Sequence, residues 1–128
     1  MPPKLLIITD LVAMPHLWMQ MLMLSEMEIH VDDHTLVNDD LSVADLAEYD
    51  LILLNLQQGV RHRIRICKQL RAQYANPLLV MLPEKNEDLM LCAYAAGADD
   101  VLVQPLDNRL LIAMVNAWLR RAKMSTQS

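Results

Sequence analysis

Short apolar runs alternate with longer amphipathic segments along this chain. Runs of four or five aliphatic residues are typical of strands that are buried on both faces of a sheet. Residues 51–54 (LILL) are the clearest case. The run at 28–31 is weaker, and the one at 101–103 is short. The predicted strands are 5–8, 28–31, 51–54, 78–82 and 101–103.

Segments with helical signals separate these strands. Pro15 suits a first helical turn, and Ser42 with Asp45 three residues later resembles a capping box. Gly97 follows an apolar segment where a left-handed helix C-cap is needed. The predicted helices are 13–27, 42–48, 60–74, 87–96 and 106–122.

Five strand–helix units in succession predict an α/β fold. We expect a single flavodoxin-like (βα)5 doubly wound domain, with a five-stranded parallel sheet and helices on both faces. It would span residues 1–122, and 123–128 would be a tail or the start of a linker. Ligands of such sheets bind at the carboxyl ends of the strands. The predicted ends are Thr9-Asp10, Asn55, Leu82-Pro83 and Gln104-Pro105.

Composition narrows the class of protein. A chain of 128 residues with 54% hydrophobic content suits one domain with one core. Its apolar runs are far shorter than the roughly 20 residues of a membrane span, and no signal-peptide pattern opens it, so we expect a cytoplasmic protein. The net charge of −5 argues against non-specific nucleic-acid binding. We expect Cys67 and Cys92 to be small buried hydrophobes.

Two segments carry a family resemblance. Residues 96–106 (AGADDVLVQPL) and 50–56 (DLILLNL) resemble the receiver domains of two-component response regulators. The order and spacing of all five units match, to about residue 122. The resemblance implies a receiver fold and a signalling function.

The residues at the family's phosphorylation site differ here. The resemblance implies that the phosphorylatable aspartate is replaced by Asn55, and the switch Ser or Thr of the fourth strand by Leu82. It also implies that Val101 replaces the switch aromatic residue, and Gln104 the lysine before proline. Two adjacent acidic residues help to hold Mg²⁺ in the family. The resemblance implies that Thr9 and Asp10 occupy these positions, so only Asp10 is acidic here.

These replacements predict that the site takes no phosphoryl group. Aspartyl phosphate forms by attack of a carboxylate, and an amide oxygen is a poor nucleophile. Mg²⁺ prefers anionic oxygen ligands, and glutamine cannot neutralise transferred charge. We therefore expect a non-phosphorylatable pseudo-receiver that is not an enzyme, with no catalytic residue, no cofactor and no metal. The degenerate pocket would comprise Thr9, Asp10, Asn55, Leu82, Val101 and Gln104.

Function would then lie in surfaces. The last helix has an apolar arc of about 200°, wider than one sheet needs, and Leu110 and Met114 lie at its side. The first helix, with Trp18, is apolar nearly all round. We expect a protein partner or a homodimer to bind through these two helices. The alternative is a broad core stripe.

Two other features are weaker. The basic stripe Arg61, Arg65 and Lys68, with His62 and Arg71 nearby, would suit an anionic partner but is better interpreted as a solvated face. His30 and His34 are too far apart on an extended strand to share a metal ion. The resemblance also predicts a cis peptide bond between Gln104 and Pro105.

Three functions fit these observations. The leading one is the amino-terminal regulatory domain of a bacterial response regulator, with a transcriptional, DNA-binding output domain further along the chain. The second is a stand-alone adaptor. The third is a small-molecule-binding flavodoxin-like domain, although Thr9, Asp10, Asn55 and Gln104 offer little acid–base chemistry.

Overall fold

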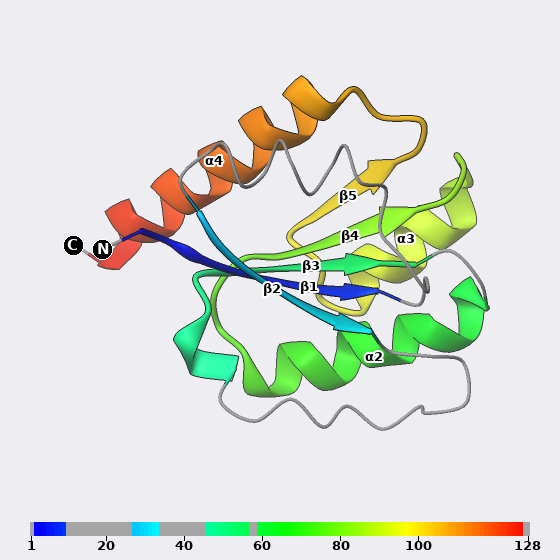
Figure 1. Ribbon diagram of the computed structural model, residues 1–128. Coiled ribbons are helices and arrows are strands. Elements are labelled where there is room, and N and C mark those ends of the chain that lie inside the picture. The colour runs from blue at the N-terminus through cyan, green and yellow to red at the C-terminus, as the bar shows by residue number, and fades with distance from the viewer. Residues whose placement is uncertain (1, 10–26, 34–45, 57–58, 127–128) are drawn as a thin grey trace.

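The fold is a five-stranded parallel sheet with helices on both faces (Figure 1). A computed structural model describes residues 2–9, 27–33, 46–56 and 59–126. The strand order is β2-β1-β3-β4-β5, so β2 and β5 are the edges. The strands are β1 (Lys4–Thr9), β2 (Glu28–Asp33), β3 (Leu51–Asn55), β4 (Leu78–Leu82) and β5 (Asp100–Val103).

Central strands β3 and β4 are buried along their whole length, as their uninterrupted apolar sequences predict. Alternate residues of each strand enter opposite cores. Leu54 and Val80 belong to one apolar cluster, and Leu53 and Leu79 to the other. Two cores of this kind require helices on both sides of the sheet.

In the part of the chain that the structure describes, helices α2 (Val60–Gln73), α3 (Glu87–Ala95) and α4 (Asn108–Thr126) cover the two faces (Figure 1). Helices α2 and α3 pack on one core, and helix α4 packs on the other. Leu111 and Val115 of α4 are fully buried. A short 3-10 helix, η1 (Leu46–Glu48), precedes β3.

The predicted fold class and all five predicted strands are confirmed. The predicted limits of the last helix, 106–122, are wrong. It begins at Asn108, where the Asp107 carboxylate accepts a hydrogen bond from the Arg109 amide at 2.8 Å, and it continues to Thr126. Residues 13–26 of the predicted helix 13–27, and residues 42–45 of the one at 42–48, lie outside the described residues. The proposed domain limit at residue 122 stays a prediction.

The predictions for Gly97 and for one of the two cysteines are confirmed. Gly97 has a φ of 115° and follows α3 as its C-cap glycine. Cys67 is buried against α3, but Cys92 is exposed, so its predicted burial is wrong. Both are free thiols.

Candidate functional site

Thr9 and Asn55 meet at the carboxyl end of the sheet. They are partners in the register of β1 and β3, and both are almost completely buried. The Asn55 amide Nδ2 donates a hydrogen bond to Thr9 Oγ1 at 3.3 Å. A buried amide needs such partners, because an unsatisfied polar group in a core is costly. Asn55 is therefore a packed, hydrogen-bonded strand end.

The other positions of the predicted pocket are apolar or neutral. Leu82 is fully buried and Val101 is 8% exposed, and both belong to the core beneath α2 and α3. Gln104 is half-buried, and its backbone amide donates to the Leu82 carbonyl at 3.0 Å. The bond from Gln104 to Pro105 is cis, as predicted. Asp10 lies outside the described residues.

We call Thr9, Asn55, Leu82, Val101 and Gln104 the strand-end site. None of these side chains is ionisable at neutral pH, so together they supply no carboxylate nucleophile and no cation. Such a set offers hydrogen bonds and apolar contacts, which suit packing more than acid–base or phosphoryl chemistry.

The described residues also lack a metal-binding group. Nowhere in that part of the chain do three or more His, Cys, Asp or Glu residues come together as a cation site. His30 is exposed on edge strand β2, with its ring 6.2 Å from that of Tyr49, and His34 lies outside the described residues.

The three predicted interaction residues, Leu110, Met114 and Trp18, have different outcomes in the structure. Leu110 on α4 is 50% exposed, in agreement with its expected place outside the core stripe. Met114 is half-buried and packs against the core, so its expected exposure is only partial. Trp18 lies outside the described residues. No helix among the described residues has the length and apolar character needed to cross a bilayer.

Asp100, the first residue of β5, links three elements at the amino end of the sheet. Its carboxylate accepts hydrogen bonds from the Tyr94 hydroxyl of α3 at 3.2 Å and the Trp118 indole of α4 at 3.1 Å. The Arg121 guanidinium stacks over the Trp118 ring at 4.8 Å. Asp100 thus joins both helices to β5. Sequence reasoning missed this role, although the resemblance had singled out the AGADD segment.

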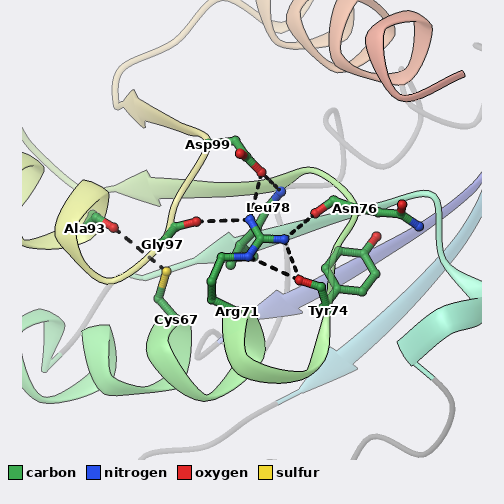
Figure 2. Close-up of polar contacts among 8 residues, drawn as sticks. All are labelled: Cys67, Arg71, Tyr74, Asn76, Leu78, Ala93, Gly97 and Asp99. Carbon is green, nitrogen blue, oxygen red and sulfur yellow. Dashed lines mark hydrogen bonds and ion pairs between the residues drawn. The ribbon is translucent and has the colours of Figure 1, made fainter. Parts of the chain in front are cut away.

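A larger polar network lies at the same amino end of the sheet, opposite the strand-end site (Figure 2). The Arg71 guanidinium, at the end of α2, donates to the carbonyls of Tyr74, Asn76 and Gly97 and to Asp99 Oδ2 at 2.9 Å. Asp99 Oδ2 also accepts from the backbone amide at the start of β4 at 2.8 Å. We call Arg71, Tyr74, Asn76, Gly97 and Asp99 the Arg71 brace.

Arg71 had been grouped with the exposed basic residues of its helix, and that grouping is wrong. Its side chain is 26% exposed and points into the brace. A helical wheel carried the signal, because at 100° per residue Arg71 lies within about 20° of both Val60 and Ile64 on the apolar face. An arginine on such a face must find buried or half-buried acceptors.

Gly97 makes room for this guanidinium. A Cβ at position 97 would lie 2.4 Å from Arg71 Cγ, so a side chain there would displace the arginine. The glycine therefore has two roles, as the residue with positive φ after α3 and as the gap that Arg71 fills.

Comparison with curated proteins connects this chain to response regulators. It is 35% identical over 80 residues to the transcriptional regulatory protein ResD of Bacillus subtilis, and 41% identical over 75 residues to Protein RcaC of Microchaete diplosiphon. These alignments cover 62% and 58% of this chain, but only 33% and 12% of the relatives. The chain thus corresponds to a fraction of either protein. No protein-family model matches the sequence.

A solved structure extends the likeness to the whole fold. The chain is 28% identical to a two-component response regulator from Clostridium difficile, with a TM-score of 0.77. The match covers 93% of this chain and 97% of that one. The likeness in sequence and fold therefore reaches over nearly all of the present chain.

Proposed function

Because this chain is a receiver domain of the kind found in two-component response regulators, we propose that it signals without accepting a phosphoryl group. The observation that carries the proposal is the environment of Asn55. This amide is completely buried and donates to Thr9 Oγ1 at the place where the family resemblance expects the phosphorylated aspartate. The domain would be a pseudo-receiver that acts through protein contacts and catalyses no reaction.

The rest of the strand-end site supports the same proposal. Transfer of a phosphoryl group needs a nucleophile and positive charge to offset the phosphate oxygens. Leu82 has no hydroxyl to donate, and the Gln104 side chain carries no charge. The buried packing of Leu82 and Val101 also favours a single arrangement of the two positions that switch in the family.

Mass spectrometry after incubation with acetyl phosphate and Mg²⁺ tests this proposal. We expect no 80-dalton adduct on the chain, while a phosphorylatable receiver treated in parallel acquires one. An adduct that forms on the wild-type chain but not on the Asn55→Gln variant would overturn the proposal, because it would place the phosphoryl group at position 55.

The relatives suggest where such a domain acts. ResD is by name a transcriptional regulatory protein, and the present chain aligns with only a third of its length. We propose that this domain likewise regulates a transcriptional output domain elsewhere in its protein. DNA would then be bound by that output domain.

The partner surface that we propose lies on α3 and α4, on both sides of β5. Leu110 on α4 is 50% exposed, and Leu91 and Tyr94 on α3 are 67% and 44% exposed. The internal bonds of Asp100 to Tyr94 and Trp118 satisfy its carboxylate within one molecule. Apolar contacts are therefore better supported there than charge pairing. A second copy of the chain is the partner that we expect.

Light scattering of Leu110→Glu tests this surface. A charge at an exposed position should leave the fold intact and convert a dimer to a monomer, with at least about a tenfold rise in the dissociation constant. Gln69→Glu, which adds the same charge at an exposed position of α2 on the other face of the sheet, is the control and should keep the dimer. A wild-type chain that is monomeric at all concentrations, or an unchanged molar mass in Leu110→Glu, would rule out this interface.

A further inference from the structure

Helix α2 carries an unusual share of the positive charge. Its 14 residues (VRHRIRICKQLRAQ) hold five of the chain's 11 Lys and Arg residues and none of its 16 Asp and Glu residues. With +5 on this helix and −5 on the whole chain, all other residues together carry −10. The helix is thus a basic segment in an acidic protein.

Three of these basic residues form one exposed stripe. At 100° per residue, Arg61, Arg65 and Lys68 fall within an arc of about 60°, and they extend over about 10 Å of helix. All three side chains are exposed, whereas Arg71 turns into the brace. No ion pair joins Arg61 or Lys68 to another described residue. We call Arg61, Arg65 and Lys68 the basic stripe.

The charge on α2 opposes the electrostatics of its own helix. The first turn contains no acidic residue, Gly59 offers no side-chain cap, and Arg61 adds positive charge where the helix dipole is already positive. Arg61 and Arg65 are also like charges four residues apart, which is destabilising.

Neighbouring helix α3, on the same face of the sheet, has the opposite design. Its N-cap Asn86 accepts a hydrogen bond from the Leu89 amide at 3.1 Å, and Glu87 and Asp88 occupy its first turn. Both features stabilise a helix N-terminus. Helix α3 therefore has the N-cap and first-turn charges that stabilise a helix, whereas α2 has neither. Departures of this kind from the usual capping and charge pattern are expected at functional surfaces.

We propose that the basic stripe is a docking surface for an acidic segment of a partner protein. Carboxylates at positions i, i+4 and i+7 of a partner helix would match the spacing of the three basic side chains. The −10 on the rest of the chain disfavours a long polyanion such as nucleic acid, whose phosphates extend beyond the stripe. A short acidic segment meets mainly α2. This surface and Leu110 lie on opposite faces of the sheet, so the proposal is independent of the proposed function.

Titration of the isotope-labelled 128-residue chain with two alanine-rich helical peptides tests the proposal. One peptide has Glu at i, i+4 and i+7, and the other has Gln at the same positions. We expect only the Glu peptide to shift amide resonances, with the changes concentrated in Val60–Gln73. Its affinity should fall at least about fivefold between 20 and 200 mM salt, because exposed charges are screened.

A pair of charge-reversal variants separates local docking from net attraction. Arg61→Glu combined with Lys68→Glu should lower the affinity for the Glu peptide at least about tenfold. Lys85→Glu combined with Arg120→Glu changes the net charge by the same amount at two other exposed positions. The affinity of this variant for the Glu peptide should stay within about twofold of wild type. Equal losses in both pairs would overturn the proposal. Tighter binding of the twelve-nucleotide oligomer dT12 than of the Glu peptide would also overturn it. So would α2 amide resonances that shift with protein concentration in the absence of peptide, because they would indicate that a second copy of the chain binds there.

Thermal unfolding checks the electrostatic premise separately. Arg61→Glu alone should raise the melting temperature by about 2–5 °C, because it places an acidic residue in the first turn and removes a like-charge pair. Arg120→Glu, near the carboxyl end of α4, should not raise it. An unchanged or lower melting temperature for Arg61→Glu would show that α2 is not strained by its charges and would remove the main support for docking.

Discussion

The two ends of the parallel sheet have opposite polar character. At the carboxyl end, Asn55 and Thr9 share a 3.3 Å hydrogen bond, and Leu82 beside them is buried and apolar. At the amino end of β4, the Arg71 guanidinium donates to three backbone carbonyls and to the Asp99 carboxylate, which also accepts a hydrogen bond from the first residue of the strand.

This contrast separates polar groups that serve chemistry from those that serve stability. The carboxyl ends of parallel strands are where α/β proteins bind ligands, and polar side chains there are often costly to the fold. In this chain the dense polar network instead connects α2, α3 and β4 at the far end (Figure 2). We therefore expect substitutions in the Arg71 brace to affect stability more than substitutions in the strand-end site.

Removal of the Arg71 side chain should have the largest effect. Arg71→Ala leaves Asp99 without its charged partner and three carbonyls without their donor, so we expect a loss of about 3 kcal/mol in the free energy of unfolding. Urea denaturation with an unchanged m-value measures it. Arg71→Lys should recover less than half, because a single ammonium cannot reach all the acceptors.

Cysteine alkylation tests whether the loss of Arg71 loosens the packing between α2 and α3. Burial raises the pKa of the Cys67 thiol to about 11, and its Sγ lies 4.0 Å from the Ala93 carbonyl between α2 and α3. At pH 8, iodoacetamide should label exposed Cys92 and spare Cys67 in wild type, and label both in Arg71→Ala. Arg61→Ala, on the exposed side of the same helix, should change stability by less than about 0.5 kcal/mol. Equal losses in the two alanine variants would contradict the brace.

A carboxylate at the strand-end site should have a smaller, pH-dependent effect. Burial of the new carboxyl in Asn55→Asp raises its pKa above the unfolded value of about 3.9. The folded state then favours the protonated form, so stability relative to wild type is nearly kept at about pH 4 and is lost as pH rises. We expect a loss of about 2 kcal/mol at pH 7, measured by denaturation at several pH values.

Added Mg²⁺ provides the decisive control for that variant. If the site lacks a cation cradle, 10 mM Mg²⁺ should not restore the stability of Asn55→Asp at pH 7. Restoration with a micromolar midpoint would contradict the proposed loss of phosphoryl chemistry, because the remaining residues would then still hold the metal.

Sequence patterns predicted the strands better than the helix ends. Strands such as 78–82 are buried on both faces, so an uninterrupted aliphatic run is enough to identify them. Helix α4 begins two residues later than predicted, where Asp107 accepts a hydrogen bond from the Arg109 amide, and it continues to Thr126. Leu110 was correctly placed at the edge of the core stripe, and Met114 was not fully exposed.

The sequence by itself determined the order of elements, the burial of the strands and the neutral chemistry of Asn55, Leu82 and Gln104. These depend on residue type and on periods of two or 3.6 residues, which are local properties. Only the tertiary structure decided which polar groups meet. Arg71 and Asp99 are 28 residues apart, and Asp100 and Trp118 are 18 apart. Such pairs form because packing brings distant backbone segments together, and no local pattern specifies which partner each side chain will find.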